Sequence, residues 1–268
     1  MRLIEQPNAG VAAARNTGWQ AARAELIAFV DADDLWAPTK IERQLAALTR
    51  AHDGVGLVYC WYSLIDIQGR VIDGGHRPGW RGPVLERLFL GNFVGNGSAA
   101  LVRRQALVDA GGFDSRLHEA GAHGCEDYLF YCRVAERYEF EVVEEPLVGY
   151  RWLPWNMSSN LTRMLRSWML VVDEMHSRHP DKAILLRRGL HDYAVWLLER
   201  ALGQRMYVRS LLASLLRRYP LLATRVIAVD VPKLAFLLAR RAGRGLMYRM
   251  RPRLYAKAPA RFSIGGVP

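Results

Sequence analysis

Residues 29–36 read FVDADDLW: two apolar residues, a run with three aspartates in four positions, and two apolar residues again. The apolar residues before the run are typical of a buried strand, so Asp31, Asp33 and Asp34 are expected where that strand ends. One explanation is a turn, because aspartate is common where strands end and helices begin. The other is a metal and phosphate site, because clustered carboxylates repel one another unless a cation or a polar ligand offsets their charge. The run alone does not separate these two explanations.

The sequence around this run alternates between strand and helix patterns. This βαβαβ order predicts an α/β fold with a mostly parallel sheet flanked by helices. In such sheets ligands collect at the carboxyl ends of strands, where the three aspartates fall. The expected strands are 1–6, 25–34, 55–65, 97–104 and 139–151, and the expected helices are 10–22, 38–51, 85–92, 104–114 and 126–138.

Composition narrows the class of protein. The chain has 268 residues, of which 51% are hydrophobic and 10% aromatic, enough for a substantial core. Its three cysteines, Cys60, Cys125 and Cys132, are odd in number and lack a paired spacing, which argues against a disulfide framework or a zinc site. No signal peptide is recognised, and charged residues interrupt the apolar stretch 221–238. We therefore expect a cytoplasmic protein without a membrane span.

Charge divides the chain into two regions. Residues 1–160 hold 16 Lys and Arg against 20 Asp and Glu, whereas residues 161–268 hold 21 against 6 and have a purely helical pattern. One explanation of the basic region is a helical bundle that packs on the first region. The other is a peripheral position at the inner face of the cell membrane, since Arg pairs at 187–188, 217–218 and 240–241 suit anionic lipid. Nucleic acid is disfavoured as a partner, because no groove-reading motif is visible.

Three longer stretches share their pattern with a known family. They are PNAGVAAARNTGWQAARAELIAFVDADDLWAPTKIERQ, GGFDSRLHEAGAHGCEDYLFYCRVA and LVGYRWLPWNMSSN, in that order. Together they resemble the family 2 inverting glycosyltransferases, which have a GT-A type fold. The resemblance implies a catalytic domain at 1–160, followed by the helical region 161–268. It also implies transfer of a sugar from a nucleotide-sugar donor to a saccharide or lipid-linked acceptor, in envelope or polysaccharide synthesis.

The resemblance implies a donor side for the site. Asp31 and Asp33 match the Asp-x-Asp element of the family, which holds the nucleotide ribose and a divalent cation, Mg²⁺ or Mn²⁺. Oxygen ligands of this kind suit either ion. Arg15 matches a residue that contacts the nucleotide, with a solvated helix arginine as the competing explanation. Asn8 and Gly10 match the tight turn before it.

The resemblance also implies the base and its surroundings. Asp127 matches the general base that takes the proton of the acceptor hydroxyl, with capping of a helix start by Glu126 or Asp127 as the competing explanation. Arg151 matches a basic residue that reaches the donor phosphates. Other residues are expected on the acceptor side or behind the site, namely Asp34, Glu126 and Gly112, of which the glycine also suits a simple turn.

One part of the family pattern has no counterpart here. The family normally opens with two further strands that bind the nucleotide, so the resemblance implies a sheet that is incomplete at its amino-terminal end. Two explanations are open: a misassigned start with a longer true protein, or a truncated gene. In the second case the product is an inactive remnant that serves as a binding or scaffolding module.

Overall fold

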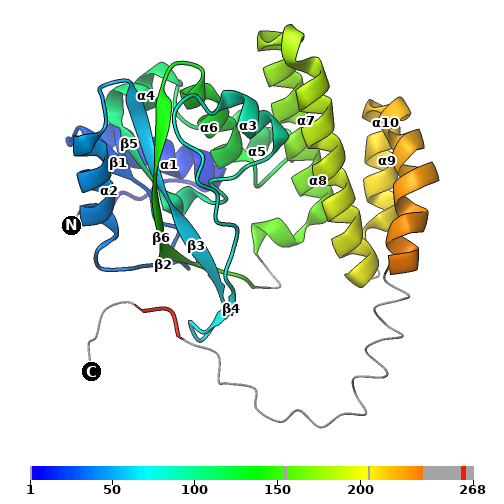
Figure 1. Ribbon diagram of the computed structural model, residues 1–268, viewed down its shortest axis with the longest axis horizontal. Coiled ribbons are helices and arrows are strands. Elements are labelled where there is room, and N and C mark those ends of the chain that lie inside the picture. Colours follow the sequence, from blue (N-terminus) through cyan, green and yellow to red (C-terminus); the bar gives the residue numbers. More distant parts are fainter. Residues whose placement is uncertain (1, 154–155, 205, 238–260, 264–268) are drawn as a thin grey trace.

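The structure is a computed structural model that describes residues 2–153, 156–204, 206–237 and 261–263. It consists of a sheet with helices around it and, beside them, a group of helices from the last third of the chain (Figure 1). The strands are β1 (Leu26–Ala28), β2 (Leu35–Trp36), β3 (Val55–Ile65), β4 (Val71–Asp73), β5 (Ala100–Arg103) and β6 (Glu139–Arg151). The helices of the first region are α1 (Gly10–Ala21), α2 (Lys40–Arg50), α3 (Leu85–Leu90), α4 (Arg104–Asp109), α5 (Arg116–Glu119) and α6 (Glu126–Ala135).

The sheet is mixed, so the prediction of a mostly parallel sheet is wrong. Its strand order is β1-β5-β3-β6-β2, with β4 paired to β3, and in the described chain only the β3–β6 pair is parallel. Strands β1, β3 and β6 run in one direction, as the alternating pattern implies. Strand β5 enters between β1 and β3 in the opposite direction, and β2 pairs antiparallel with β6. Periodicity identifies strands but carries no information about their direction, which is why this insertion was missed.

The expected strand 1–6 is also wrong over its described part. Residues 2–9 have no regular structure, and Leu3 is 79% exposed because nothing in the described chain pairs with this segment. Of the expected strand 25–34, only Leu26–Ala28 forms a strand, β1, because the chain leaves the sheet before Asp31. In contrast, the predictions for 55–65 and 139–151 are confirmed as β3 and β6.

Aromatic packing fixes the acidic turn, residues 31–34, relative to helix α6. Phe29 meets Phe113 edge to face at 5.0 Å, and Phe113 stacks on Phe130 of α6 at 4.5 Å. Ring contacts of this kind stabilise a fold beyond the area that they bury, and both Phe113 and Phe130 are buried. The segment that leads into the acidic turn is therefore held against the helix that carries Asp127.

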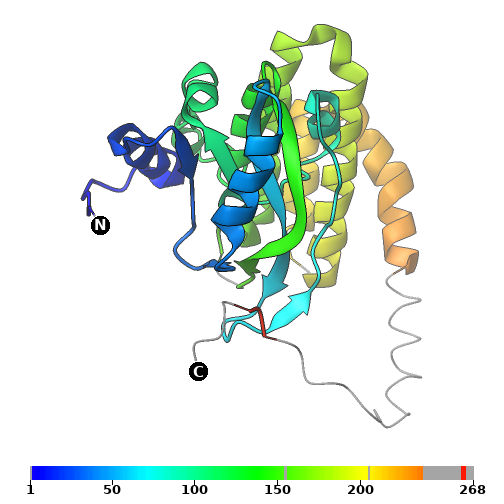
Figure 2. The ribbon, with the colours of Figure 1, turned by 60° about the vertical axis from the view of Figure 1, so that its left-hand side comes forward.

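The last third of the described chain is a helical group that packs on the first region. It contains α7 (Leu161–Arg178), α8 (Ala183–Gln204), α9 (Val208–Arg218), α10 (Pro220–Arg225) and a π-helical turn at Val226–Asp230. Helix α8 packs on α3 and helix α7 on α6, and Figure 2 shows the group from a second side. Ion pairs cross the contact, among them Arg133 to Glu174 at 2.7 Å.

These contacts agree with the packing explanation of the basic region. No described helix is both long and apolar enough to cross a membrane. The predicted division at residue 160 remains a prediction, and the Arg pair 240–241 lies outside the described residues.

Candidate functional site

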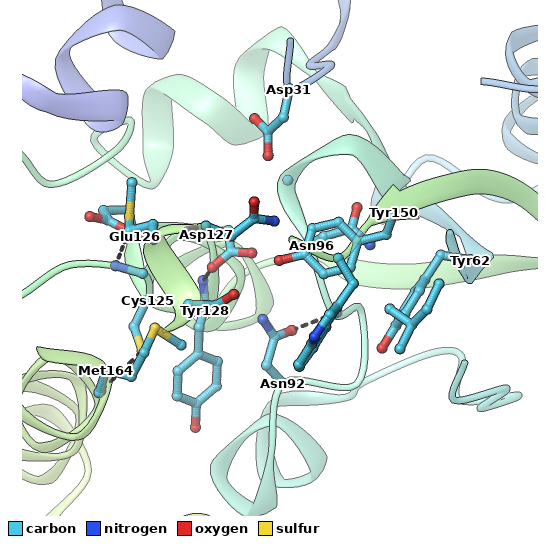
Figure 3. A pocket seen from close by; sticks show the side chains of 18 of the residues that line it. Asp31, Tyr62, Asn92, Asn96, Cys125, Glu126, Asp127, Tyr128, Tyr150 and Met164 are labelled. Atoms are coloured by element: carbon cyan, nitrogen blue, oxygen red, sulfur yellow. Dashed lines mark hydrogen bonds between the residues drawn. The ribbon is translucent and has the colours of Figure 1, made fainter. Parts of the chain in front are cut away.

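A cavity of about 1170 Å³ opens at the carboxyl ends of β1, β3 and β6. Its walls come from the acidic turn, the ends of β3 and β6, the first turn of α6, and helices α7 and α8. In Figure 3 the carboxylate of Asp31 points across this cavity towards Asp127. Although only one strand pair of the described residues is parallel, the acidic turn therefore lies at a shared carboxyl edge, as predicted.

Arg15 links the two acidic parts of the cavity. From helix α1 its Nη2 donates to Asp31 Oδ1 at 2.5 Å, and its side chain is only 10% exposed. Burial lowers the pKa of Arg15, but the carboxylates of Asp31 and Asp127 outweigh that effect and leave the pKa raised. The guanidinium lies close beside Gly97, where a Cβ would overlap it. Arg15 is thus a fixed cation in the cavity, and the explanation as a solvated helix arginine does not describe it.

Asp34 is the last residue of the acidic turn and is 8% exposed. Ser98 Oγ donates to Asp34 Oδ2 at 2.6 Å and accepts from the N–H of Asp31 at 3.0 Å, while the N–H of Arg151 donates to Asp34 Oδ1. Burial raises the pKa of Asp34 to about 6 against these hydrogen bonds. Asp34 therefore holds the turn in shape and does not line the cavity.

Asp31 and Asp33 are the residues that could hold a divalent cation. Both line the cavity, and no hydrogen bond within the described chain occupies the Asp33 carboxylate or Asp31 Oδ2. No group of three or more His, Cys, Asp or Glu suited to a metal ion occurs among the described residues. Mg²⁺ is usually held by one or two carboxylates together with substrate phosphates. This pair therefore fits an ion shared with a diphosphate and does not fit an all-protein cage.

Asp127 lies in the first turn of α6 and faces the cavity. Burial raises its pKa to about 7, opposed by Arg15 and by the N–H of Tyr128, which donates to Asp127 Oδ1 at 2.7 Å. Glu126 is 3% exposed, and its Oε2 accepts from the N–H of Gly124 at 2.8 Å. Both acids thus bond local backbone N–H groups, and burial brings the pKa of Asp127 near neutrality.

Four further predicted site residues lie outside the cavity wall, as Asp34 does. The Arg151 guanidinium donates to the carbonyls of Asp33, Asp66 and Ile67, so it ties the acidic turn to the β3–β4 turn. Asn8 Oδ1 accepts from the N–H of Gly10, which has φ 85° and lies against His118. Gly112, at φ 69°, leaves room for Asn16 of α1. Contact of Arg151, Asn8 and Gly10 with the donor stays a prediction, because none of the three lines the cavity. For Gly112 a role in forming a turn is the simpler explanation.

The cavity also contains residues that sequence reasoning did not single out. Asn96 is 3% exposed, and its Nδ2 is buried without a hydrogen-bond partner in the described chain. Aromatic and basic residues of β6, α7 and α8 complete the far wall. A signal for α8 existed, since positions 193, 196 and 200 follow the spacing of one helix face. The missed residues of this wall are Tyr150, Trp152, Trp168, Tyr193, Trp196 and Arg200.

Comparisons with known proteins agree on one family. The sequence model of the family described as "Glycosyltransferase like family 2" matches residues 3–179. An uncharacterized glycosyltransferase of Methanocaldococcus jannaschii is 27% identical over 150 residues, which is 56% of this chain and 49% of that protein. An uncharacterized glycosyltransferase of Nostoc is 30% identical over 159 residues, 56% of this chain and 47% of that protein. The chain thus spans about half the length of these relatives.

A solved structure shows the same fold. The mannosyltransferase PcManGT of Pyrobaculum calidifontis, in complex with GDP-Man and Mn²⁺, superposes with a TM-score of 0.51. The match covers 91% of this chain and 63% of that chain at 19% identity. At this identity the likeness establishes a GT-A-like fold and does not extend to substrates.

Proposed function

The chain belongs to the glycosyltransferase family 2-like proteins, and from that membership we propose that it transfers a sugar from a nucleotide-sugar donor to an acceptor hydroxyl, with inversion. The observation that carries this proposal is the single cavity that brings the acidic turn and Asp127 together, with Arg15 between their charges. These three positions come from separate parts of the sequence, and a simple turn or helix cap would not require them to meet.

The donor side of the proposed reaction is the acidic turn. Asp31 and Asp33 would hold a Mg²⁺ or Mn²⁺ ion, which stabilises the departing diphosphate when bound. Arg15 keeps Asp31 in place and adds a fixed positive charge on the same side. Ser98 and Asp34 fix the backbone of the turn, so its carboxylates need little rearrangement when the donor binds.

The base of the proposed reaction is Asp127. Inversion by one displacement forms a bond from the acceptor oxygen to the anomeric carbon and breaks the bond from that carbon to the diphosphate. The proton of the acceptor hydroxyl passes to Asp127. A carboxylate whose pKa is about 7 is a stronger base than an ordinary aspartate and is still largely ionised in mildly alkaline solution.

A panel of nucleotide sugars tests this proposal. PcManGT was solved with GDP-Man, so that donor is tested first, followed by other hexose donors, each with saccharide and lipid-linked acceptors. We expect the release of nucleoside diphosphate with one donor, its loss on addition of EDTA, and its return with Mn²⁺. Proton NMR of the product reports the anomeric configuration. A product with the configuration of the donor, or turnover that is indifferent to EDTA, would contradict the mechanism proposed here.

A further inference from the structure

The cavity continues past Asp127 to a cationic position that the proposed transfer does not use. Arg200 of helix α8 lines this end, and its guanidinium lies over the rings of Trp152 at 4.7 Å and Trp196 at 4.8 Å. These contacts hold the guanidinium against an aromatic wall. They leave its N–H groups for other partners.

Arg200 lacks the partners that the other cavity arginine has. It forms no ion pair with any residue that the structure describes, and its Nη1 is buried without a hydrogen bond from that part of the chain. Arg15, in the same cavity, is paired with Asp31. A buried donor without an acceptor destabilises a fold, and more so when it is charged. The lowered pKa of Arg200, caused by burial, reflects the same cost.

The aromatic wall beside Arg200 adds two further donors. Trp168 of α7 stacks on Tyr128 at 4.2 Å and on Tyr193 at 3.8 Å. Trp168 Nε1 and the Tyr193 hydroxyl are also buried without a hydrogen-bond partner among the described residues. An indole and a guanidinium can only donate, so their natural partner is a group rich in acceptor oxygens. A phosphoryl group matches this donor set and the charge of Arg200.

This end of the cavity is close to the proposed base. Tyr128, the residue after Asp127, stacks on Trp168, which in turn stacks on Tyr193. The ring of Tyr193 lies 5.6 Å from that of Trp196, over which the Arg200 guanidinium lies. The acidic turn, in contrast, has Arg15 as its cation. A group bound at Arg200 would therefore lie on the acceptor side of Asp127.

We propose that Arg200 binds a phosphate or diphosphate group of the acceptor, and that the aromatic side chains of α7 and α8 hold the adjoining part of that molecule. The proposal rests on the proposed function, because it makes the substrate of this cavity a phosphorylated acceptor. Two sources share this chemistry: a soluble sugar phosphate and a polyprenyl-phosphate-linked sugar.

Paired probes that differ only in the phosphate test the proposal. Glucose 1-phosphate is compared with methyl glucoside, and geranyl phosphate with geraniol, by calorimetry on protein saturated with GDP or UDP and Mn²⁺. The variants are Arg200→Gln and Arg200→Lys, and the control is Arg187→Gln, an exposed arginine of the same helix. We expect at least one phosphorylated probe to bind about tenfold or more tightly than its partner. Arg200→Gln should abolish that difference, Arg200→Lys should keep part of it, and Arg187→Gln should leave it unchanged.

The outcomes separate this proposal from the proposed function. Nucleotide binding by Arg200→Gln should equal that of the wild type, and a loss there would overturn the proposal by placing Arg200 on the donor side. The proposal would also be overturned if phosphorylated and plain probes bound with equal affinity. The same holds if Arg200→Gln and Arg187→Gln changed the preference for phosphate equally. If no nucleotide binds to any variant, the proposed function fails. The same titrations without nucleotide then still show whether Arg200 selects phosphate. Selective binding of glucose 1-phosphate would indicate a soluble sugar phosphate as the acceptor, and selective binding of geranyl phosphate a polyprenyl-phosphate-linked sugar.

Discussion

Asp127 lies at a helix start, where its carboxylate accepts a backbone hydrogen bond and burial raises its pKa to about 7. Because a base acts in its ionised form, the pH dependence of transfer reports on this residue directly. An exposed helix-capping aspartate would ionise near its ordinary pKa of about 3.9 and would leave the rate flat above pH 5.

We predict that kcat/KM falls about tenfold for each pH unit below about 7 and reaches a plateau above it. The cause is protonation of Asp127, whose pKa is raised by burial. Initial rates from pH 5 to 9 at fixed Mn²⁺ measure the profile. Residual activity of Asp127→Asn should lack this limb. A rate that declines only below pH 5 would show that another group, or none, acts as the base.

At this scale the sequence predicted some residues and not others. The identities of Asp31, Asp33 and Asp127 follow from pattern and resemblance, and the cavity contains all three. The engagement of Arg151 with three backbone carbonyls does not follow, because it depends on how the β3–β4 turn folds back on the acidic turn. Residues of α7 and α8 were missed for a similar reason, since helix periodicity does not indicate which face meets which cavity.

Among the elements, the short 3₁₀ helix Gly97–Ala99 connects the two halves of the donor side. Ser98 bonds both Asp34 and the backbone of Asp31, and Gly97 leaves space for the guanidinium of Arg15. A side chain at Gly97 would therefore meet the guanidinium of Arg15 first.

We predict that Gly97→Ala weakens binding of nucleoside diphosphate and Mn²⁺ by about tenfold, because the new methyl group displaces Arg15 from Asp31. Calorimetry measures the affinity. The control is Gly18→Ala, on the helix that carries Arg15, where a Cβ meets nothing within 4 Å. That change should leave affinity unaltered and raise the free energy of unfolding by about 0.5–1 kcal/mol. Unchanged affinity in Gly97→Ala would remove Arg15 from the proposed donor site.

The boundaries of the strands follow from the local sequence, whereas their order and direction in the sheet do not. Strands β3 and β6 were predicted to the residue, because β3 is a long apolar run and β6 opens with alternating acidic and apolar residues. The position of β5 between β1 and β3 could not be predicted, since strand direction depends on the path of the chain through β4 and α3. The predicted strand at 1–6 failed over its described residues, because a short apolar pattern forms a strand only when a partner is present.

In the whole molecule, basic charge that is not used for packing gathers on the outer helices. Arg218 is paired with Asp173 at 2.6 Å and belongs to the packing. Four exposed residues make no ion pair within the described chain, and large apolar side chains such as Leu216 and Leu221 are exposed near them. The four are Arg209, Arg217, Arg225 and Lys233.

We predict that changing these four residues to Gln reduces binding to vesicles containing anionic lipid by at least tenfold, with little change in melting temperature. Each basic residue near such a surface contributes about 1 kcal/mol, and the attraction should weaken as salt rises. Cosedimentation at two salt concentrations measures it. The control replaces four exposed arginines of the first region, Arg2, Arg23, Arg50 and Arg137. If wild-type protein ignores the vesicles at low salt, the basic region serves packing alone.

Asp33 is proposed to bind the cation and Asp127 to act as the base. Calorimetry and transfer assays on Asp33→Ala and Asp127→Asn test these two roles most directly. We predict that Asp33→Ala loses affinity for nucleotide and Mn²⁺. Asp127→Asn should bind both as the wild type does and lose transfer by on the order of 10²–10⁴-fold, the usual contribution of a positioned base. Equal loss of nucleotide affinity in the two variants, or transfer that survives in Asp127→Asn, would contradict the roles proposed for the two ends of this cavity.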